Sequence, residues 1–137
     1  MKFIKVRAIV EGYAEGPALI SKEPISFYGG IDPRTGVIRE KGHPLEGKTV
    51  KNTILIFPYG KGSTVGSYVL LSLAKHGVAP KAIVNLESEP IIVIGCLLAK
   101  IPLVDKPQED VFKILNDNEN VKVIANKENA YICIEER

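Results

Sequence analysis

The segment from residue 53 to residue 75 most constrains the fold, because a strand pattern, a glycine-rich turn and a helix pattern follow one another there. The uncharged run at 53–57 predicts a buried strand. Residues 59–63 read Tyr-Gly-Lys-Gly-Ser, and the helix expected at 64–75 places Val65, Val69 and Leu73 on one stripe, with Tyr68 beside it. A turn at a helix start presents free N–H groups and the positive end of the helix dipole, which suits an anion.

Ser63 lies in this turn and has two interpretations. The more common one is an N-cap, because a serine hydroxyl accepts a hydrogen bond from an otherwise unpaired N–H at a helix start. The other is a chemical role. A nucleotide-binding P-loop is rejected, because Lys61 lies between two glycines and no earlier glycine has the required spacing. A nucleophile elbow is rejected because Lys61 stands where that motif needs glycine.

A second glycine-rich segment, Ser-Phe-Tyr-Gly-Gly-Ile-Asp-Pro, occupies residues 26–33. Its structural interpretation is a turn that Phe27 and Ile31 anchor to the core. Its functional interpretation is a ligand contact, because Gly29 and Gly30 allow the backbone to approach a bound group closely. Asp32 follows them in the same loop. The segment by itself leaves both interpretations open.

The remaining pattern predicts one β-rich α/β domain over residues 1–137, in which a barrel-like sheet is flanked by helices. Strands are expected at 2–11 (ending at Gly12), 18–21, 25–27, 82–84 and 103–104, with a short surface helix at 108–116 and a C-terminal hairpin formed by 121–124 and 130–134. The uncharged run 91–99 can be a helix or a strand, and Pro90 at its start slightly favours a helix.

Charge and hydropathy exclude several classes of protein. The formal charge is +2 and the lysines are scattered, which argues against nucleic acid as a partner. No apolar run reaches the 18 or so residues of a membrane span. The N-terminal segment alternates like a strand and lacks the apolar core of a signal peptide, so a cytoplasmic protein is expected. His43 and His76 have no partners at metal-ligand spacing, and structural or surface roles are expected for both.

Cys96 and Cys133 are the only cysteines, and each lies in an apolar run that predicts a buried structural thiol. An iron–sulfur cluster normally needs more thiolates than two. If such a cluster takes part in the function of this protein, another chain must hold it.

Four motifs in order resemble the small subunit of the aconitase X family, over about residues 8–104. They are Ser-Phe-Tyr-Gly-Gly-Ile-Asp-Pro-x-Thr-Gly at 26–36, His-Pro-Leu-x-Gly at 43–47, Gly-Lys-Gly-Ser at 60–63 and Gly-x-Ala-Pro-x-Ala-Ile at 77–83. The resemblance implies a fold similar to the mobile swivel domain of aconitase. It also implies a heterodimer in which a large subunit carries a [4Fe-4S] cluster, and no metal bound by this chain.

The same resemblance implies which residues act. Aconitase-like swivel domains carry Gly-Ser-Ser-Arg at a helix start, and the first serine is the base that abstracts a proton. That position is Ser63 here. The expected substrate contacts are Gly29, Gly30, Asp32, Lys61, Gly62 and Thr64. Val65 stands where aconitase has its substrate-binding arginine, so binding of citrate or isocitrate is not expected.

The implied reaction is dehydration of a small anionic hydroxy acid. Archaeal members of the family dehydrate 5-phosphomevalonate to anhydromevalonate phosphate in the mevalonate route to isoprenoids, and a separate small chain with this composition favours that substrate. Bacterial and fungal relatives, usually with the two parts fused, act on cis-3-hydroxyproline. A non-catalytic swivel-like regulatory or scaffold partner is the alternative of another class.

Overall fold

A computed structural model describes residues 1–135. The elements in chain order are β1 (Lys2–Val10), β2 (Gly12–Ile20), β3 (Ile25–Ser26), β4 (Ile54–Ile56), β5 (Gly60–Lys61), α1 (Gly66–Lys75), β6 (Ala82–Val84), α2 (Pro90–Ala99), β7 (Leu103–Asp105), α3 (Val111–Ile114), β8 (Asn120–Ala125) and β9 (Ala130–Ile134). No helix among these residues is long and apolar enough to cross a membrane.

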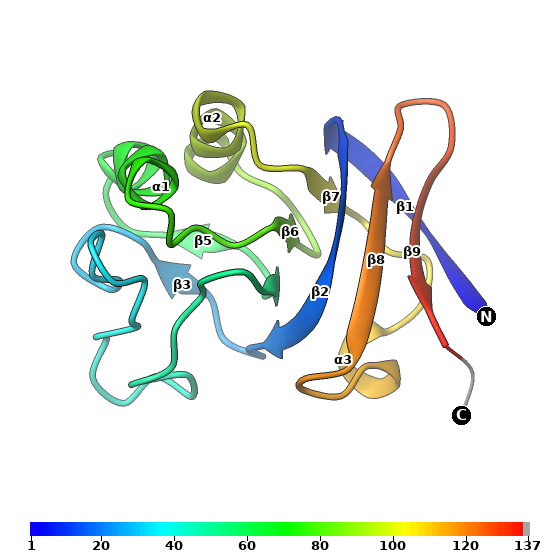
Figure 1. Ribbon diagram of the computed structural model, residues 1–137, viewed down its shortest axis with the longest axis horizontal. Helices are drawn as coiled ribbons and strands as arrows, with labels where there is room; N and C mark the ends of the chain where they lie inside the picture. Colours follow the sequence, from blue (N-terminus) through cyan, green and yellow to red (C-terminus); the bar gives the residue numbers. More distant parts are fainter. Residues whose placement is uncertain (136–137) are drawn as a thin grey trace.

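Seven strands close into a barrel in the order β1-β7-β6-β4-β2-β8-β9. Strands β2, β4, β6 and β7 run parallel to one another, and the other pairs in the barrel are antiparallel. Figure 1 shows the barrel on the right and α1 and α2 side by side on the left, and both helices pack against the outer face of the parallel strands. The expected β-rich barrel with flanking helices is therefore confirmed.

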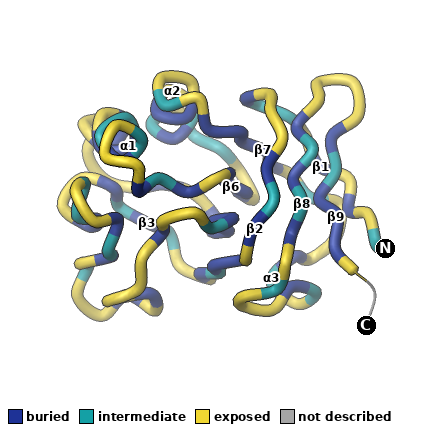
Figure 2. Tube along the Cα trace, viewed as in Figure 1, coloured by how far each residue is buried: buried dark blue, intermediate teal, exposed yellow. Residues whose placement is uncertain are grey.

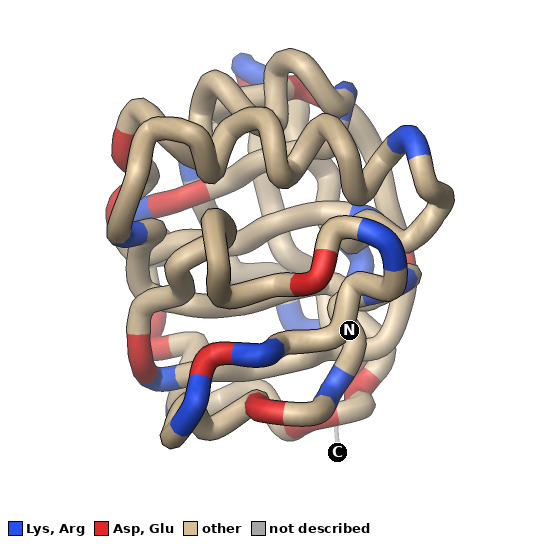
Figure 3. Tube along the Cα trace, turned by 90° about the vertical axis from the view of Figure 1, so that its left-hand side faces the viewer, with Lys and Arg blue, Asp and Glu red and all other residues tan. Residues whose placement is uncertain are grey.

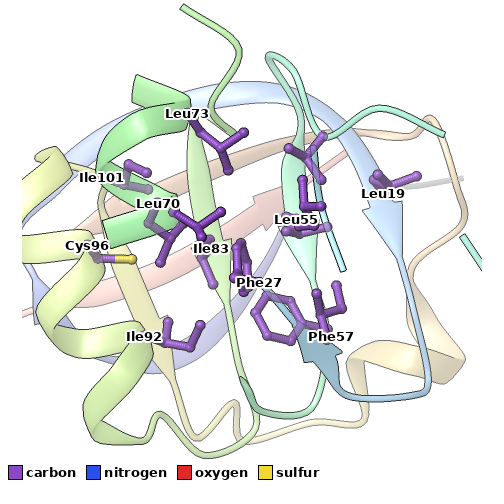
Figure 4. Packing of buried hydrophobic residues seen from close by; sticks show 14 of the residues in the cluster. Leu19, Phe27, Leu55, Phe57, Leu70, Leu73, Ile83, Ile92, Cys96 and Ile101 are labelled. Carbon is purple, nitrogen blue, oxygen red and sulfur yellow. The ribbon is translucent and has the colours of Figure 1, made fainter. Parts of the chain in front are cut away.

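Two hydrophobic cores lie on the two faces of the parallel strands, because side chains alternate along a strand. Ile54 and Ile56 point into the barrel interior, while Leu55 points the other way, under the helices. Figure 4 shows the core under the helices, where Leu70 and Leu73 of α1 pack beside Ile92 and Cys96 of α2. In Figure 2 the strands are largely buried, while the outer turns of α1 and α2 and many of the connecting loops are exposed.

Several expectations about elements need correction. The second strand begins at Gly12 rather than at 18, because β2 pairs with β8 up to Pro17 and only then turns to β4. Gly16 and Pro17 interrupt the alternation that identifies a strand. The surface helix expected at 108–116 is a single turn, α3. The stripe expected on α1 is also wrong at one end, because Val65 and Tyr68 are exposed while Val69, Leu70 and Leu73 are buried.

The run 91–99 forms helix α2, which settles the choice between helix and strand. Pro90 is its first residue, where a missing N–H costs nothing. The carboxylate of Glu89 caps the helix and accepts from the N–H groups of Ile91 at 2.9 Å and Ile92 at 3.0 Å. Lys100 ends the helix in the left-handed conformation, at φ 58°.

The two histidines have the structural roles expected of them. The buried His43 ring accepts from the N–H of Leu45 at 3.0 Å, and its other nitrogen lies 3.1 Å from the carbonyl oxygen of Pro24. His76 forms the C-cap of α1. Phe27 and Ile31 are buried in the core under the helices, as expected for the anchors of their turn.

An ion pair between the exposed Arg7 of β1 and the buried Asp105 of β7 joins these two strands of the barrel. Asp105 is fully buried and accepts two bonds from Arg7, both at 2.9 Å, and two from Ser88, at 2.6 Å from the hydroxyl and 3.0 Å from the N–H. Burial alone raises the pKa of Asp105, but the hydrogen bonds from Arg7 and Ser88 outweigh it and lower the pKa.

We expect Arg7→Ala to lower the free energy of unfolding by about 2 kcal/mol at neutral pH, because the buried carboxylate loses its charged donor and keeps only Ser88. The folded-state pKa of Asp105 is depressed, so this pairing stabilises above the unfolded pKa of about 3.9 and is lost as pH falls through the folded value. Urea unfolding at neutral pH and in acid checks this: the difference in the free energy of unfolding between Arg7→Ala and the unmodified protein must become smaller in acid. Lys5→Ala on the same strand, at an exposed position, is the control.

Candidate active site

The two glycine-rich segments of the sequence lie side by side. Strand β4 ends at Ile56, and the chain then leaves the barrel and forms the short strand β5. The sequence pattern predicts only a turn at the position of β5. β5 pairs in parallel with β3, with Ile25 opposite Gly60 and Ser26 opposite Lys61. The chain leaves both strands through a glycine-rich turn, so the turns of residues 26–32 and 60–64 are neighbours (Figure 1). The two turns lie beyond the carboxyl end of the parallel strand β4, a position where α/β sheets commonly bind ligands.

Ser63 is exposed and its side-chain oxygen accepts from the N–H of Val65 at 3.1 Å. The first helical amide to bond a backbone carbonyl is that of Gly66, which donates to Ser63 at 2.9 Å. The N–H of Thr64 precedes this bond at the positive end of the helix. The N-cap residue of α1 is Val65, which makes no side-chain cap hydrogen bond, so Ser63 closes the turn before the helix rather than capping the helix itself. Its exposed hydroxyl has an N–H directed at its oxygen.

Gly62 and Gly66 allow the backbones of the two segments to approach each other closely. Gly62 has φ +91°, and a Cβ there would lie 2.6 Å from the hydroxyl oxygen of Ser26. A Cβ on Gly66 would lie 3.1 Å from Cγ2 of Ile91 in α2 and at ordinary contact distance, 3.4 Å, from the Cβ of Phe27. A side chain at Gly62 would therefore displace the hydroxyl of Ser26, and one at Gly66 would crowd α2.

The neighbouring glycines Gly29 and Gly30 have different reasons to be glycine. Gly29 is exposed at φ +80°, with no atom within 4 Å of a Cβ built on it, so its conformation is what favours glycine. Gly30 is buried, and a Cβ there would overlap the carbonyl oxygen of Ser26. Gly29 is therefore the accessible one of the two.

Asp32 is held in a turn of its own. Its carboxylate accepts from the N–H of Arg34 at 2.9 Å and lies 3.8 Å from the guanidinium of Arg39. The backbone bond from Arg34 is the main cause that lowers the pKa of Asp32. A hollow of about 370 Å³ is lined by Tyr28, Gly29, Ile31, Asp32, Pro33, Arg39 and Val69. The structure therefore joins Asp32 and Gly29 in one hollow beside α1, whose described lining does not include Ser63 or Lys61.

Lys61 has a partner that the sequence motif does not indicate. Its ammonium lies 3.0 Å from Oε2 of Glu40, in the long connection between β3 and β4. Ser26 is also missed, although its hydroxyl borders Gly62. Only the β3–β5 pairing brings these residues together, so no local pattern could have identified them. Figure 3 shows acidic and basic residues interspersed along the chain, which agrees with scattered ion pairs of this kind.

The residues of this chain do not fit an iron–sulfur cluster. Cys96 is fully buried under the helices, where burial raises the pKa of its thiol, while Cys133 lies on β9 beside the sulfur of Met1. Both are free and buried, as expected. Among residues 1–135 no group of three or more His, Cys, Asp or Glu side chains could hold a metal ion.

Comparison with known proteins identifies the family of this fold. The model of the aconitase X swivel domain matches residues 3–132. The phosphomevalonate dehydratase small subunit of Methanosarcina mazei is 52% identical over 119 residues, which are 87% of this chain and 83% of that protein. The corresponding small subunit of Archaeoglobus fulgidus is 50% identical over 132 residues, 96% of this chain and 97% of that one.

Solved structures give the same result. The crystal structure of Thermococcus kodakaraensis aconitase X in its holo-form has a TM-score of 0.92 and 42% identity, covering 99% of this chain and 100% of that chain. A second protein, solved by solution NMR, has a TM-score of 0.87 and 47% identity, covering 98% of this chain and 100% of that one. From the swivel fold, the matched domain and these relatives, the chain belongs to the aconitase X swivel domain family.

Proposed function

We propose that this chain is the small subunit of a phosphomevalonate dehydratase and that Ser63 is its general base. The observation that carries the proposal is the position of Ser63: exposed at a helix start, with the Val65 N–H donating to its side-chain oxygen, beside the 26–32 turn. The names of the relatives at about 50% identity support the substrate.

The reaction is an elimination. The C–H bond next to the substrate carboxylate breaks and its electrons form a C=C bond as the C–O bond to the hydroxyl breaks. Such a proton is weakly acidic and needs a strong base, and a serine alkoxide is strong enough if its charge is stabilised. The Val65 N–H, 3.1 Å from Oγ, and the positive end of α1 supply that stabilisation in this chain. Ser63 accepts the proton, and the proton and the hydroxide together leave as water.

The anionic groups of the substrate would be held by the turns of residues 26–32 and 60–64. The N–H of Thr64 precedes the first bonded amide of α1 and suits a carboxylate or phosphate oxygen. Gly29 and Gly62 leave the backbone accessible at positive φ, and the ammonium of Lys61 has donors beyond the one it gives Glu40. Gly30 and Asp32 complete the site by shaping the turn. The uncharged Val65 at the arginine position of aconitase predicts poor binding of citrate and isocitrate.

The rest of the site would come from a larger partner subunit. The small-subunit names of the relatives imply such a partner, and the buried, separated cysteines of this chain support placing a [4Fe-4S] cluster there. Exposed apolar side chains flank the Ser63 turn, where a partner that closes over the site would cover them: Tyr28, Val65 and Tyr68. The proposal is a cytoplasmic heterodimer that is active only when both subunits are present, with this chain folded as one domain.

An assay of the assembled enzyme tests the function. Co-expression with a cluster-binding partner, followed by assay on 5-phosphomevalonate and on cis-3-hydroxyproline, is expected to give dehydration of the first only. Each subunit alone is expected to be inactive, because each would hold half of the site. Turnover of hydroxyproline alone would contradict the substrate. Full turnover by the partner without this chain would instead support a non-catalytic scaffold.

A further inference from the structure

Glu40 is an acidic side chain near the Ser63 turn that the proposed site does not use. It lies outside both glycine-rich motifs, in the connection between β3 and β4. Its carboxylate reaches both segments: Oε2 lies 3.0 Å from the ammonium of Lys61, and Oε1 accepts a longer bond of 3.4 Å from the N–H of Ser26.

The backbone of Glu40 is fixed to the same turn. Its N–H and that of Arg39 both donate to the carbonyl oxygen of Gly30, at 3.2 and 2.7 Å. A Cβ on Gly30 would lie 3.3 Å from Oε1 of Glu40, so the carboxylate is packed against this turn. The Glu40 side chain is 26% exposed, against 45% for Lys61. The less exposed and better fixed member of the ion pair is therefore the acid.

This arrangement changes what Lys61 can do. A free lysine side chain on a surface loses rotamer entropy when a ligand immobilises it. The bond to Glu40 restricts Lys61 before any substrate arrives, and an ammonium with three donors retains two for a second acceptor. An interaction set up in advance in this way strengthens ligand binding without a new contact.

We propose that Glu40 is a positioning residue of this site, which fixes the ammonium of Lys61 next to the Ser63 turn so that it binds an anionic group of the substrate. The proposal rests on the proposed function for the identity of the ligand. It adds that the anion-binding lysine is oriented by an acid from a distant segment.

The test uses the assembled enzyme and 5-phosphomevalonate. We expect Glu40→Ala to raise KM about tenfold with little change in kcat, because the lost interaction serves substrate binding rather than the chemical step. Lys61→Ala is expected to raise KM at least as much. In the double variant the two effects must not add, because Glu40 acts through Lys61. Glu40→Gln, which keeps an oxygen acceptor, is expected to recover part of the loss.

Glu46→Ala is the matched control. Glu46 lies in the same connection, and its carboxylate accepts only from the N–H of Gly42, at 3.0 Å, among the contacts described. It should leave KM unchanged. A KM unaltered or lowered in Glu40→Ala, or effects of Glu40 and Lys61 that add fully, would overturn the proposal and leave Glu40 with a structural role.

A second readout does not depend on turnover. The acylation rate of Lys61 in the assembled complex, followed by mass spectrometry, is expected to rise in Glu40→Ala and not in Glu46→Ala, because the ammonium is released from its partner. An unchanged rate would show that Glu40 does not hold Lys61. If the unmodified complex failed to act on 5-phosphomevalonate, the proposed function would fail, and this labelling result would still decide whether Glu40 positions Lys61.

Discussion

Ser63→Ala is expected to reduce turnover of the assembled enzyme by about a hundredfold to ten-thousandfold, the usual contribution of a general base. The substitution removes the oxygen that would accept the proton and keeps the backbone of the turn. It also removes the hydrogen bond from the Val65 N–H in the turn before α1, so the free energy of unfolding should fall by about 0.5–1.5 kcal/mol. Steady-state kinetics and urea unfolding of the same preparation separate the two effects.

Two further variants distinguish a base from a residue that only closes the turn. The side-chain oxygen of asparagine can accept the same hydrogen bond from the N–H two residues on, but it is not a strong base, so Ser63→Asn should keep the stability and lose the activity. Ser67→Ala removes another hydroxyl from the start of α1, whose bond goes to the carbonyl of Thr64 at 2.9 Å, and should retain turnover. An active Ser63→Asn enzyme would limit Ser63 to closing the turn before α1.

Gly30→Ala is expected to destabilise the fold by about 3 kcal/mol, at the upper end of the cost of overpacking. The added methyl group would overlap the carbonyl oxygen of Ser26, a backbone atom that cannot rotate away. The turn would have to open, which would strain the bonds from Arg39 and Glu40 to the Gly30 carbonyl and the β3–β5 pairing. Thermal or urea unfolding measures the loss.

Gly29→Ala is the matched control one residue away. Its Cβ would meet open space, so only the positive φ is penalised, at about 1 kcal/mol. The difference between the two variants therefore isolates the clash from the loss of glycine flexibility. Equal destabilisation by the two substitutions would show that the 26–32 turn adapts and that its close packing does not hold the site together.

The strands and helices that local pattern identifies are those whose side chains alternate or repeat without interruption. The strand 53–57, the helix after Ser63 and the C-terminal hairpin have such patterns, and the structure has them within a few residues. The failures have physical causes. In β2, Gly16 and Pro17 hide a strand that changes neighbours midway. In β5, two residues are too few to show a period.

The candidate site divides in the same way. The glycines, the serine at the helix start and the shortage of cysteines can be identified in the sequence, because each reflects a local requirement of backbone conformation, capping or metal chemistry. The ion pair of Lys61 with Glu40 cannot, because its partners are 21 residues apart and only the β3–β5 pairing brings them together.

The sequence by itself therefore determined the class of fold, the family and the serine on which the proposed chemistry depends. Local hydrogen bonding and hydrophobic period are properties of neighbouring residues, and these suffice to identify a helix start and a buried strand. The tertiary structure decided which segments adjoin Ser63, how Glu40 holds Lys61, and that Gly29 rather than Gly30 is accessible. Those contacts depend on strand pairing between distant segments, which residue order alone does not specify.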